Sequence, residues 1–165
     1  MTFKKRIKPG PGQESVWDYP RPPRLEDSNK HIQIIFNGTV IADTHRAKRV
    51  LETSHPPVYY IPPEDIKMDH LKSTGRATWC EWKGQAAYYT VTVGNKQVLN
   101  AGWYYCEPTP AFMPLKYYVA FYPSLMDACF VDGEHVQAQA GDFYGGWITN
   151  DIVGPFKGGS GTIGW

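Results

Sequence analysis

The sequence predicts a mainly β fold: a small bent antiparallel sheet or half-open barrel with a few short helices and a wrapping, Gly/Trp-rich C-terminal tail. Alternating apolar segments separated by Asn-Gly and Asp-Gly turns predict hairpins rather than helices. Prolines crowd the first 30 residues and exclude them from helix interiors and central strands. A length of 165 residues with 42% hydrophobic content suits one core. We therefore expect a single domain over 1–165, with an extended N-terminal arm (1–30), a β core (31–140) and a tail packed on that core (141–165).

The first elements of the core are predicted to be a hairpin and a short helix. Residues 31–36 alternate apolar and polar side chains, an Asn-Gly pair follows, and residues 39–42 resume the pattern, which predicts a β-hairpin. Asp43 and Thr44 are N-cap residue types, and apolar residues then recur at helical spacing. We expect a helix over 44–52.

A strand, a second short helix and a three-stranded meander follow. Residues 58–61 are β-branched and aromatic, and the Pro-Pro-Glu-Asp run after them favours the start of a helix, expected over 62–71. Glycine-containing turns then separate three β-prone segments, predicted as antiparallel strands at 77–83, 86–93 and 96–105.

The C-terminal third is predicted to contain short strands and an irregular tail. Residues 117–122, 126–131 and 134–137 are β-prone, and an Asp-Gly turn separates the last two. Beyond residue 141 glycines are interleaved with Trp147 and Trp165, so we expect no regular element there. Because these aromatic rings need burial, the tail should wrap the core.

Composition and charge exclude several classes of protein. The 17 Lys and Arg residues against 16 Asp and Glu residues give a net charge of +1, which provides no basic surface for nucleic acid. Cys80, Cys106 and Cys129 are odd in number and follow no metal-ligand spacing, so we expect neither a disulfide framework nor a structural zinc site. We expect no metal and no cofactor. No segment has the apolar length of a membrane span or a secretion signal, and a cytoplasmic protein is the simplest interpretation.

The densest group of chemically capable side chains lies at residues 49–62, around Pro56 and Pro57. Adjacent prolines fix two φ angles and hold the preceding residue extended, so polar side chains there are positioned at low entropic cost. Glu52 and His55 are suited to form an acid/base couple. The structural alternative has Glu52 bonded to backbone amides and His55 stacked on an aromatic ring.

A second group lies at the first meander strand. Strict alternation sends Cys80 to one face and both Glu81 and Lys83 to the other. Cys80 beside a lysine or histidine is suited to act as a thiolate nucleophile, and its alternative role is a small buried thiol. For Glu81 and Lys83 the alternative to catalysis is a simple ion pair.

Aromatic residues come from four predicted strands: Tyr59, Tyr60, Tyr88, Tyr89, Trp103, Tyr105 and Tyr122. If the rings on one face of these strands converge, they line a pocket for a flat ligand such as a nucleobase, a flavin-like ring or an aromatic acid. The alternative is that they fill an ordinary β core.

The leading hypothesis is a small-molecule-binding β domain with an aromatic-lined pocket. Its expected ligand-binding residues are Arg49, Glu52, His55, Tyr60, Cys80, Lys83, Tyr105 and Tyr122. A competing hypothesis is an enzyme whose catalytic residue is Glu52, His55 or Cys80. A third is a structural module that forms a homo-oligomer through its proline-rich arm and its tail. No nucleic-acid or membrane partner is expected under any of the three.

Six segments are together long and unusual enough to identify a protein family: VWDYPRPP at 16–23, RVLETSHPPVYYIPPEDI at 49–66, TWCEWKGQAAYY at 78–89, AGWYYCEPTP at 101–110, VAFYP at 119–123 and YGGWITNDIVGPFKGGSGTIGW at 144–165. Through them nearly the whole chain resembles the bacterial and fungal family catalogued as domain of unknown function 427, also labelled nucleotidyltransferase-like. The resemblance implies a fold similar to the half-open barrels of the Mss4-like architecture. It implies little about activity, because nucleotidyl transfer uses paired carboxylates to hold Mg²⁺ beside phosphates, and the chain has neither an Asp-x-Asp motif nor a GxxxxGK[ST] loop.

Overall fold

The computed structural model describes residues 6–141, 144–159, 161–162 and 164–165. The first five residues of the expected arm and positions 142, 143, 160 and 163 of the expected tail lie outside the described residues. The architecture is mainly β, with several antiparallel sheets and a few short 3-10 segments, and over the described residues the sheets do not close into a barrel. The predicted mainly β class, with antiparallel sheets and a few short helical segments, is confirmed.

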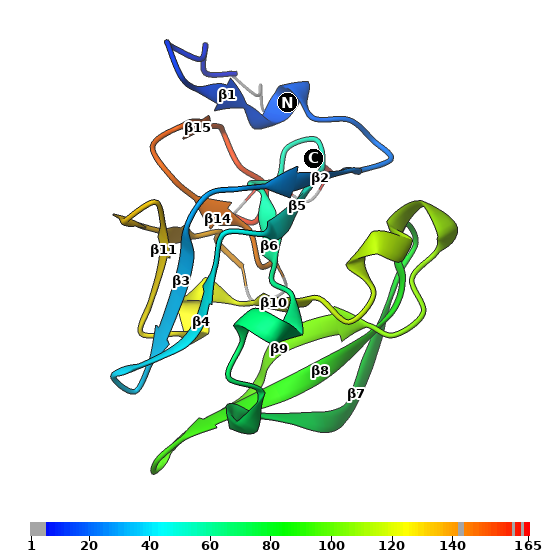
Figure 1. The fold of residues 1–165 in the computed structure, drawn as a ribbon. Helices are drawn as coiled ribbons and strands as arrows, with labels where there is room; N and C mark the ends of the chain where they lie inside the picture. Colours follow the sequence, from blue (N-terminus) through cyan, green and yellow to red (C-terminus); the bar gives the residue numbers. More distant parts are fainter. Residues whose placement is uncertain (1–5, 142–143, 160, 163) are drawn as a thin grey trace.

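A long antiparallel meander forms one of the two four-stranded sheets (Figure 1). It consists of β7 (Leu71–Cys80), β8 (Gly84–Val93) and β9 (Lys96–Tyr105), and the short β10 (Val119–Phe121) pairs with the outer edge of β9. The predicted meander is confirmed, although β7 begins before residue 77. The pairing register shifts once in the β7–β8 ladder and once in the β8–β9 ladder. Irregularities of this kind bend and twist a sheet, so the meander is curled rather than flat.

The other four-stranded sheet contains the predicted hairpin. Its strands are β3 (Ile32–Phe36), β4 (Thr39–Thr44), β11 (Ala128–Val131) and β12 (Glu134–His135). Asn37 and Gly38 both have positive φ, as a type I′ turn requires, and this residue pair favours that turn. The side-chain amide of Asn37 donates to the carbonyl of Val93 across 2.8 Å and ties the hairpin to the tip of the meander.

The predicted helix over 44–52 is wrong, because most of this segment is a strand. β5 (Ala47–Leu51) lies between β2 (Arg24–Ser28) and β6 (Val58–Tyr60) in a three-stranded antiparallel sheet. Helices shorter than about 12 residues are marginal in isolation, so backbone pairing on both edges outweighs helical spacing here. β2 belongs to the expected arm, which therefore contributes an edge strand to this sheet.

Proline-rich connections form 3-10 turns rather than helices. In place of the helix expected over 62–71 the chain makes two such turns, η2 (Pro63–Asp65) and η3 (Met68–His70), before β7 begins. The other 3-10 segments are η1 (Val16–Asp18), η4 (Pro110–Leu115) and η5 (Pro123–Leu125). None of the described helical segments is long and apolar enough to cross a membrane.

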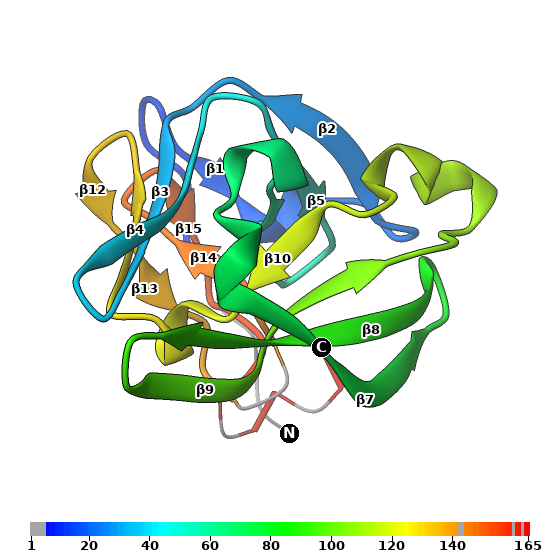
Figure 2. The ribbon, with the colours of Figure 1, turned by 60° about the horizontal axis from the view of Figure 1, so that its bottom comes forward.

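The arm and the tail pair with each other and with the core. β1 (Glu14–Ser15) runs parallel to β15 (Ile152–Val153), and β13 (Gln137–Ala138) pairs with β14 (Trp147–Ile148). The tail thus contains two short strands, which corrects the expectation of no regular element. Trp147 is buried and its indole N–H donates to the carbonyl of Phe121 across 3.3 Å, which anchors β14 beside β10 (Figure 2).

The two faces of the meander pack against different cores. On β8, Tyr89 packs against the core that also contains the buried aliphatic residues of β3 and β4, whereas its neighbour Tyr88 belongs to an aromatic cluster on the opposite face. The buried members of this second cluster include Tyr60, Tyr88, Trp103, Tyr105, Phe112 and Tyr122. Period-two alternation therefore separates the predicted aromatic residues into two sets.

Candidate functional site

A cavity of about 460 Å³ lies on the aromatic side of the meander. Small-molecule sites in proteins typically have volumes of about 300–1,000 Å³. The cavity is lined by Glu52, His55, Val58 and Tyr60 near the proline corner, by Thr78, Trp79, Cys80, Glu81, Trp82 and Lys83 at the end of β7, by Ala86, Tyr88, Trp103, Tyr105 and Tyr122, and by Tyr144, Gly145 and Lys157 of the tail. The structure thus brings seven of the eight expected ligand-binding residues to one cavity, all except Arg49.

The corner that carries Glu52 and His55 is held by backbone hydrogen bonds. The amide of His55 donates to the carbonyl of Glu52 across 3.0 Å, and the amide of Ser54 donates to the carbonyl of Val16 across 3.0 Å. Ser54 is buried and has a positive φ of 72°, so the chain turns sharply before the two prolines. Both prolines are buried as well, which fixes the direction in which the chain leaves His55.

The imidazole of His55 has a defined tautomer. Its Nδ1 lies 2.9 Å from the carbonyl oxygen of Thr53, which can only accept, so Nδ1 carries the hydrogen and Nε2 carries the lone pair of the neutral ring. Burial lowers the pKa of His55, although the carboxylate of Glu52 opposes this shift. Glu52 and His55, the expected acid/base couple, are not hydrogen-bonded to each other, because Nδ1 of His55 is 3.9 Å from Oε2 of Glu52. Nε of Arg21 lies closer to the same carboxylate oxygen, at 3.3 Å.

Another part of the lining is the end of β7 and the turn over 81–83. Thr78 and Cys80 line the cavity, and Trp79 is 73% exposed at its rim. Because β7 ends at Cys80, the turn interrupts the alternation and brings Lys83 to the same cavity. The expectation that Cys80 and Lys83 lie on opposite faces is therefore wrong.

Thr109 holds the turn that presents Lys83. The amide of Thr109 donates to the carbonyl of Lys83 across 3.0 Å, and its hydroxyl donates to the carbonyl of Trp82 across 2.7 Å. Both bonds come from the loop after β9, so the position of Lys83 is fixed by tertiary contacts rather than by the turn alone.

The ammonium group of Lys83 lies against aromatic rings. Its Nζ is 5.8 Å from the ring centre of Tyr105 and 5.9 Å from that of Phe112. Burial acts to lower the pKa of Lys83, but the neighbouring Tyr60 hydroxyl and Cys80 thiol outweigh it, and the net shift is upward. Lys83 is therefore a partly buried cation at neutral pH.

The floor of the cavity is a group of mutually packed rings. The ring centres of Trp103 and Tyr122 are 4.6 Å apart, and Tyr60 lies 6.3 Å from Trp103 and 6.4 Å from Tyr105. The indole N–H of Trp103 donates to the hydroxyl of Tyr60 across 3.4 Å. Burial raises the pKa of Tyr60, Tyr105 and Tyr122, so these phenols are neutral at physiological pH.

The tail lines the cavity beside His55. The Tyr144 ring meets His55 edge-on with centres 5.3 Å apart, and Lys157 Nζ lies 5.7 Å from the centre of the Tyr144 ring. A Cβ added to Gly145 would lie 2.2 Å from the Trp103 ring, so the absence of a side chain permits this close approach. Sequence reasoning missed these tail residues, because an aperiodic glycine-rich segment gives no signal of which side chains face the core.

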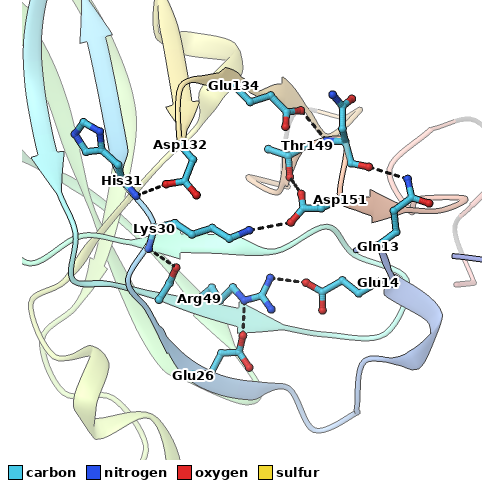
Figure 3. Close-up of polar contacts among 12 residues, drawn as sticks. Gln13, Glu14, Glu26, Lys30, His31, Arg49, Asp132, Glu134, Thr149 and Asp151 are labelled. Atoms are coloured by element: carbon cyan, nitrogen blue, oxygen red, sulfur yellow. Dashed lines mark hydrogen bonds and ion pairs between the residues drawn. The ribbon is translucent and has the colours of Figure 1, made fainter. Parts of the chain in front are cut away.

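Arg49 lies outside the cavity, in a polar network that joins the arm and the tail to the core (Figure 3). Its guanidinium pairs with Glu14 of β1 across 2.7 Å and with Glu26 of β2. Alternation along β5 explains the separation, because Val50 packs into the aromatic cluster and its neighbour Arg49 faces the other way. Within the described residues, the position of Arg49 is that of a structural cation.

A larger hollow of about 710 Å³ lies along β2 and β5, but its charged groups are already paired. Lys48 binds Asp27, Arg46 binds Asp65, and Arg49 binds Glu26. The hollow along β2 and β5 lacks the cluster of buried aromatic rings that forms the floor of the smaller cavity. We therefore take the aromatic cavity as the candidate site.

The three cysteines are free thiols in different environments. Cys80 is partly buried at the cavity, Cys106 is exposed, and Cys129 is buried, which raises the pKa of its thiol. In the part of the chain that the structure describes, no three His, Cys, Asp or Glu side chains cluster as potential metal ligands.

Fold and site together define a mainly β protein with an aromatic, lysine-containing cavity that its own C-terminal tail helps to line. Comparison with known families gives its particular membership. A family model described as Domain of unknown function (DUF427) matches residues 24–132, and the chain belongs to that family. The matched segment contains the proline corner and the whole meander, whereas the tail lies beyond it. A search of curated proteins found no match.

Proposed function

We propose that this protein binds a small molecule with a planar ring in the aromatic cavity. The observation that carries the proposal is the convergence of buried rings from β6, β8 and β9 on one hollow that also has His55 and Lys83 at its walls. A mainly apolar or aromatic lining with a few placed polar groups is the usual composition of small-molecule sites. The neutral phenols and the Nε2 lone pair of His55 supply hydrogen-bonding groups that would orient a ring between them.

Tyr88 and Tyr89 provide a matched pair of variants, because these neighbours lie on opposite faces of β8. Tyr88→Leu is expected to weaken the binding of a planar probe, quinoline-2-carboxylate, about fivefold, since an aromatic contact contributes ~1 kcal/mol. Tyr89→Leu removes an equally large ring, stacked on Tyr104 with centres 4.5 Å apart and outside the cavity, and should leave affinity unchanged. Isothermal titration calorimetry on both variants measures the difference.

Equal losses of affinity in the two variants would argue against the cavity as the binding site. A panel of planar heterocycles, acids and nucleobases that produced no shift in melting temperature and no heat of binding would argue against ligand binding altogether.

A second candidate function, catalysis at Cys80, is favoured by the presence of its thiol, Lys83 and His55 around one cavity. Reactive cysteines typically lie beside a lysine or histidine in a partly exposed site. Cys80 should then react with iodoacetamide faster than Cys106, although Cys106 is the more exposed of the two. Peptide mass spectrometry over a time course compares the two sites in the same sample. A slower reaction at Cys80, as exposure alone dictates, would leave this candidate without support.

A further inference from the structure

Lys83 has no matching negative charge among the side chains that line the aromatic cavity. The charged side chains that line it are Glu52, Glu81, Lys83 and Lys157. Glu52 is already matched by Arg21, whose Nε lies 3.3 Å from its carboxylate, and Glu81 is exposed at the rim. His55 contributes no charge, because burial lowers its pKa and favours the neutral ring. The inner part of the cavity is therefore positive.

Lys83 has weak partners inside the cavity. Its partners are the Tyr60 hydroxyl, the Cys80 thiol, which hydrogen-bonds to it, and the ring faces of Tyr105 and Phe112, and none of these groups is a carboxylate. Over the residues that the structure describes, no carboxylate lies within 4.0 Å of this nitrogen, so no ion pair compensates its partial burial. An ammonium group has three hydrogens to donate, and a buried charge is stable only when it is paired or hydrogen-bonded.

The rings of the cavity floor lie next to this cation. The ammonium group of Lys83 lies over the ring of Tyr105. The Tyr105 ring is next to that of Tyr60, and the Tyr60 ring is next to that of Trp103. A ligand whose ring packs on this floor would place a substituent within reach of Lys83. A cationic substituent would be repelled there, and a neutral one would leave the ammonium without a counter-charge.

We propose that the ligand is a planar monoanion, an aromatic or heteroaromatic carboxylate, whose carboxylate pairs with Lys83 while its ring packs against Tyr60, Trp103 and Tyr105. This inference rests on the proposed function and specifies its chemistry. It identifies Lys83 as the residue that selects an acid over the isosteric amide, because only the acid supplies the missing negative charge.

The test compares quinoline-2-carboxylate with quinoline-2-carboxamide, which share ring and shape and differ in charge. Wild-type protein should bind the acid at least tenfold more tightly than the amide in isothermal titration calorimetry. Lys83→Met should bind both equally weakly, and Lys83→Arg should keep a preference for the acid. Lys116→Met is the matched control: Lys116 is exposed and lies 5.3 Å from the ring of Tyr117 outside the cavity, so its loss should not change the preference.

The failures of the two proposals are distinguishable. If the amide binds as tightly as the acid, the anionic ligand is wrong and the planar-ligand site stands. If Lys83→Met still prefers the acid over the amide, another cation binds the carboxylate and this inference is overturned. If no planar probe binds, charged or neutral, both proposals fail. Should Lys83→Met not fold, Lys83→Gln with wild-type circular dichroism provides the same comparison.

Discussion

Gly158→Ala is expected to lower the free energy of unfolding by about 3 kcal/mol and to loosen the tail, because two costs add at this position. Gly158 has a φ of +123°, which side-chain-bearing residues rarely adopt. A Cβ there would also lie 2.0 Å from the carbonyl oxygen of Ala140, a backbone atom that cannot move aside alone. Urea denaturation followed by tryptophan fluorescence measures the change.

The adjacent Gly159 supplies the control for this prediction. It is exposed, an added Cβ meets nothing within 4 Å, and its φ lies outside the left-handed region. Gly159→Ala should therefore change stability by less than about 0.5 kcal/mol. Two variants with equal stability would mean that the tail does not pack on residue 140 as described.

Arg49→Met is expected to destabilise the protein by about 2–3 kcal/mol, because it leaves Glu14 and Glu26 without their shared cation. The side chain of Arg49 is only 14% exposed, whereas Glu14 and Glu26 are 36% and 32% exposed, so water restores part of the solvation of the two carboxylates and keeps the loss below that of a fully buried pair. The loss should release β1 and the arm first, since Glu14 lies on β1. Chemical denaturation gives the free energy, and hydrogen exchange locates the opening.

Arg46→Met is the matched control for Arg49. Arg46 makes two hydrogen bonds to Asp65, but its side chain is 63% exposed. Exposed ion pairs contribute about 0–1 kcal/mol, so this variant should lose no more than that. A larger loss from Arg46→Met than from Arg49→Met would contradict the structural role assigned to the network in Figure 3.

Local signals in the sequence were sufficient to predict much of the fold. The hairpin at Asn37-Gly38 and the glycine turns of the meander are set by backbone geometry that few other residues adopt, so they were predictable. The segment 44–52 was not, because its apolar residues fit helical spacing and its strand pairing comes from β2 and β6, which are distant in sequence. Tertiary pairing overrides weak local propensity in such short segments.

The candidate site was predictable to the extent that alternation determines side-chain direction. Tyr60, Tyr105 and Tyr122 lie at the cavity with the groups of the proline corner. The predicted place of Arg49 at the cavity is wrong because its segment is a strand and not a helix, and in β5 Arg49 faces away from Val50. Lys83 was assigned to the wrong face because the turn that follows Cys80 does not alternate.

The most direct test of the account is a two-dimensional ¹H–¹⁵N NMR titration of the full chain with quinoline-2-carboxylate. The central claim is that the proline corner and the β7–β8 turn form two walls of one ligand site. The amides of residues 52–55 and of residues 80–83 should then shift together along one binding curve, while those of the Asn37-Gly38 turn stay fixed. Shifts confined to one wall, or centred on the β3–β4 hairpin, would contradict it.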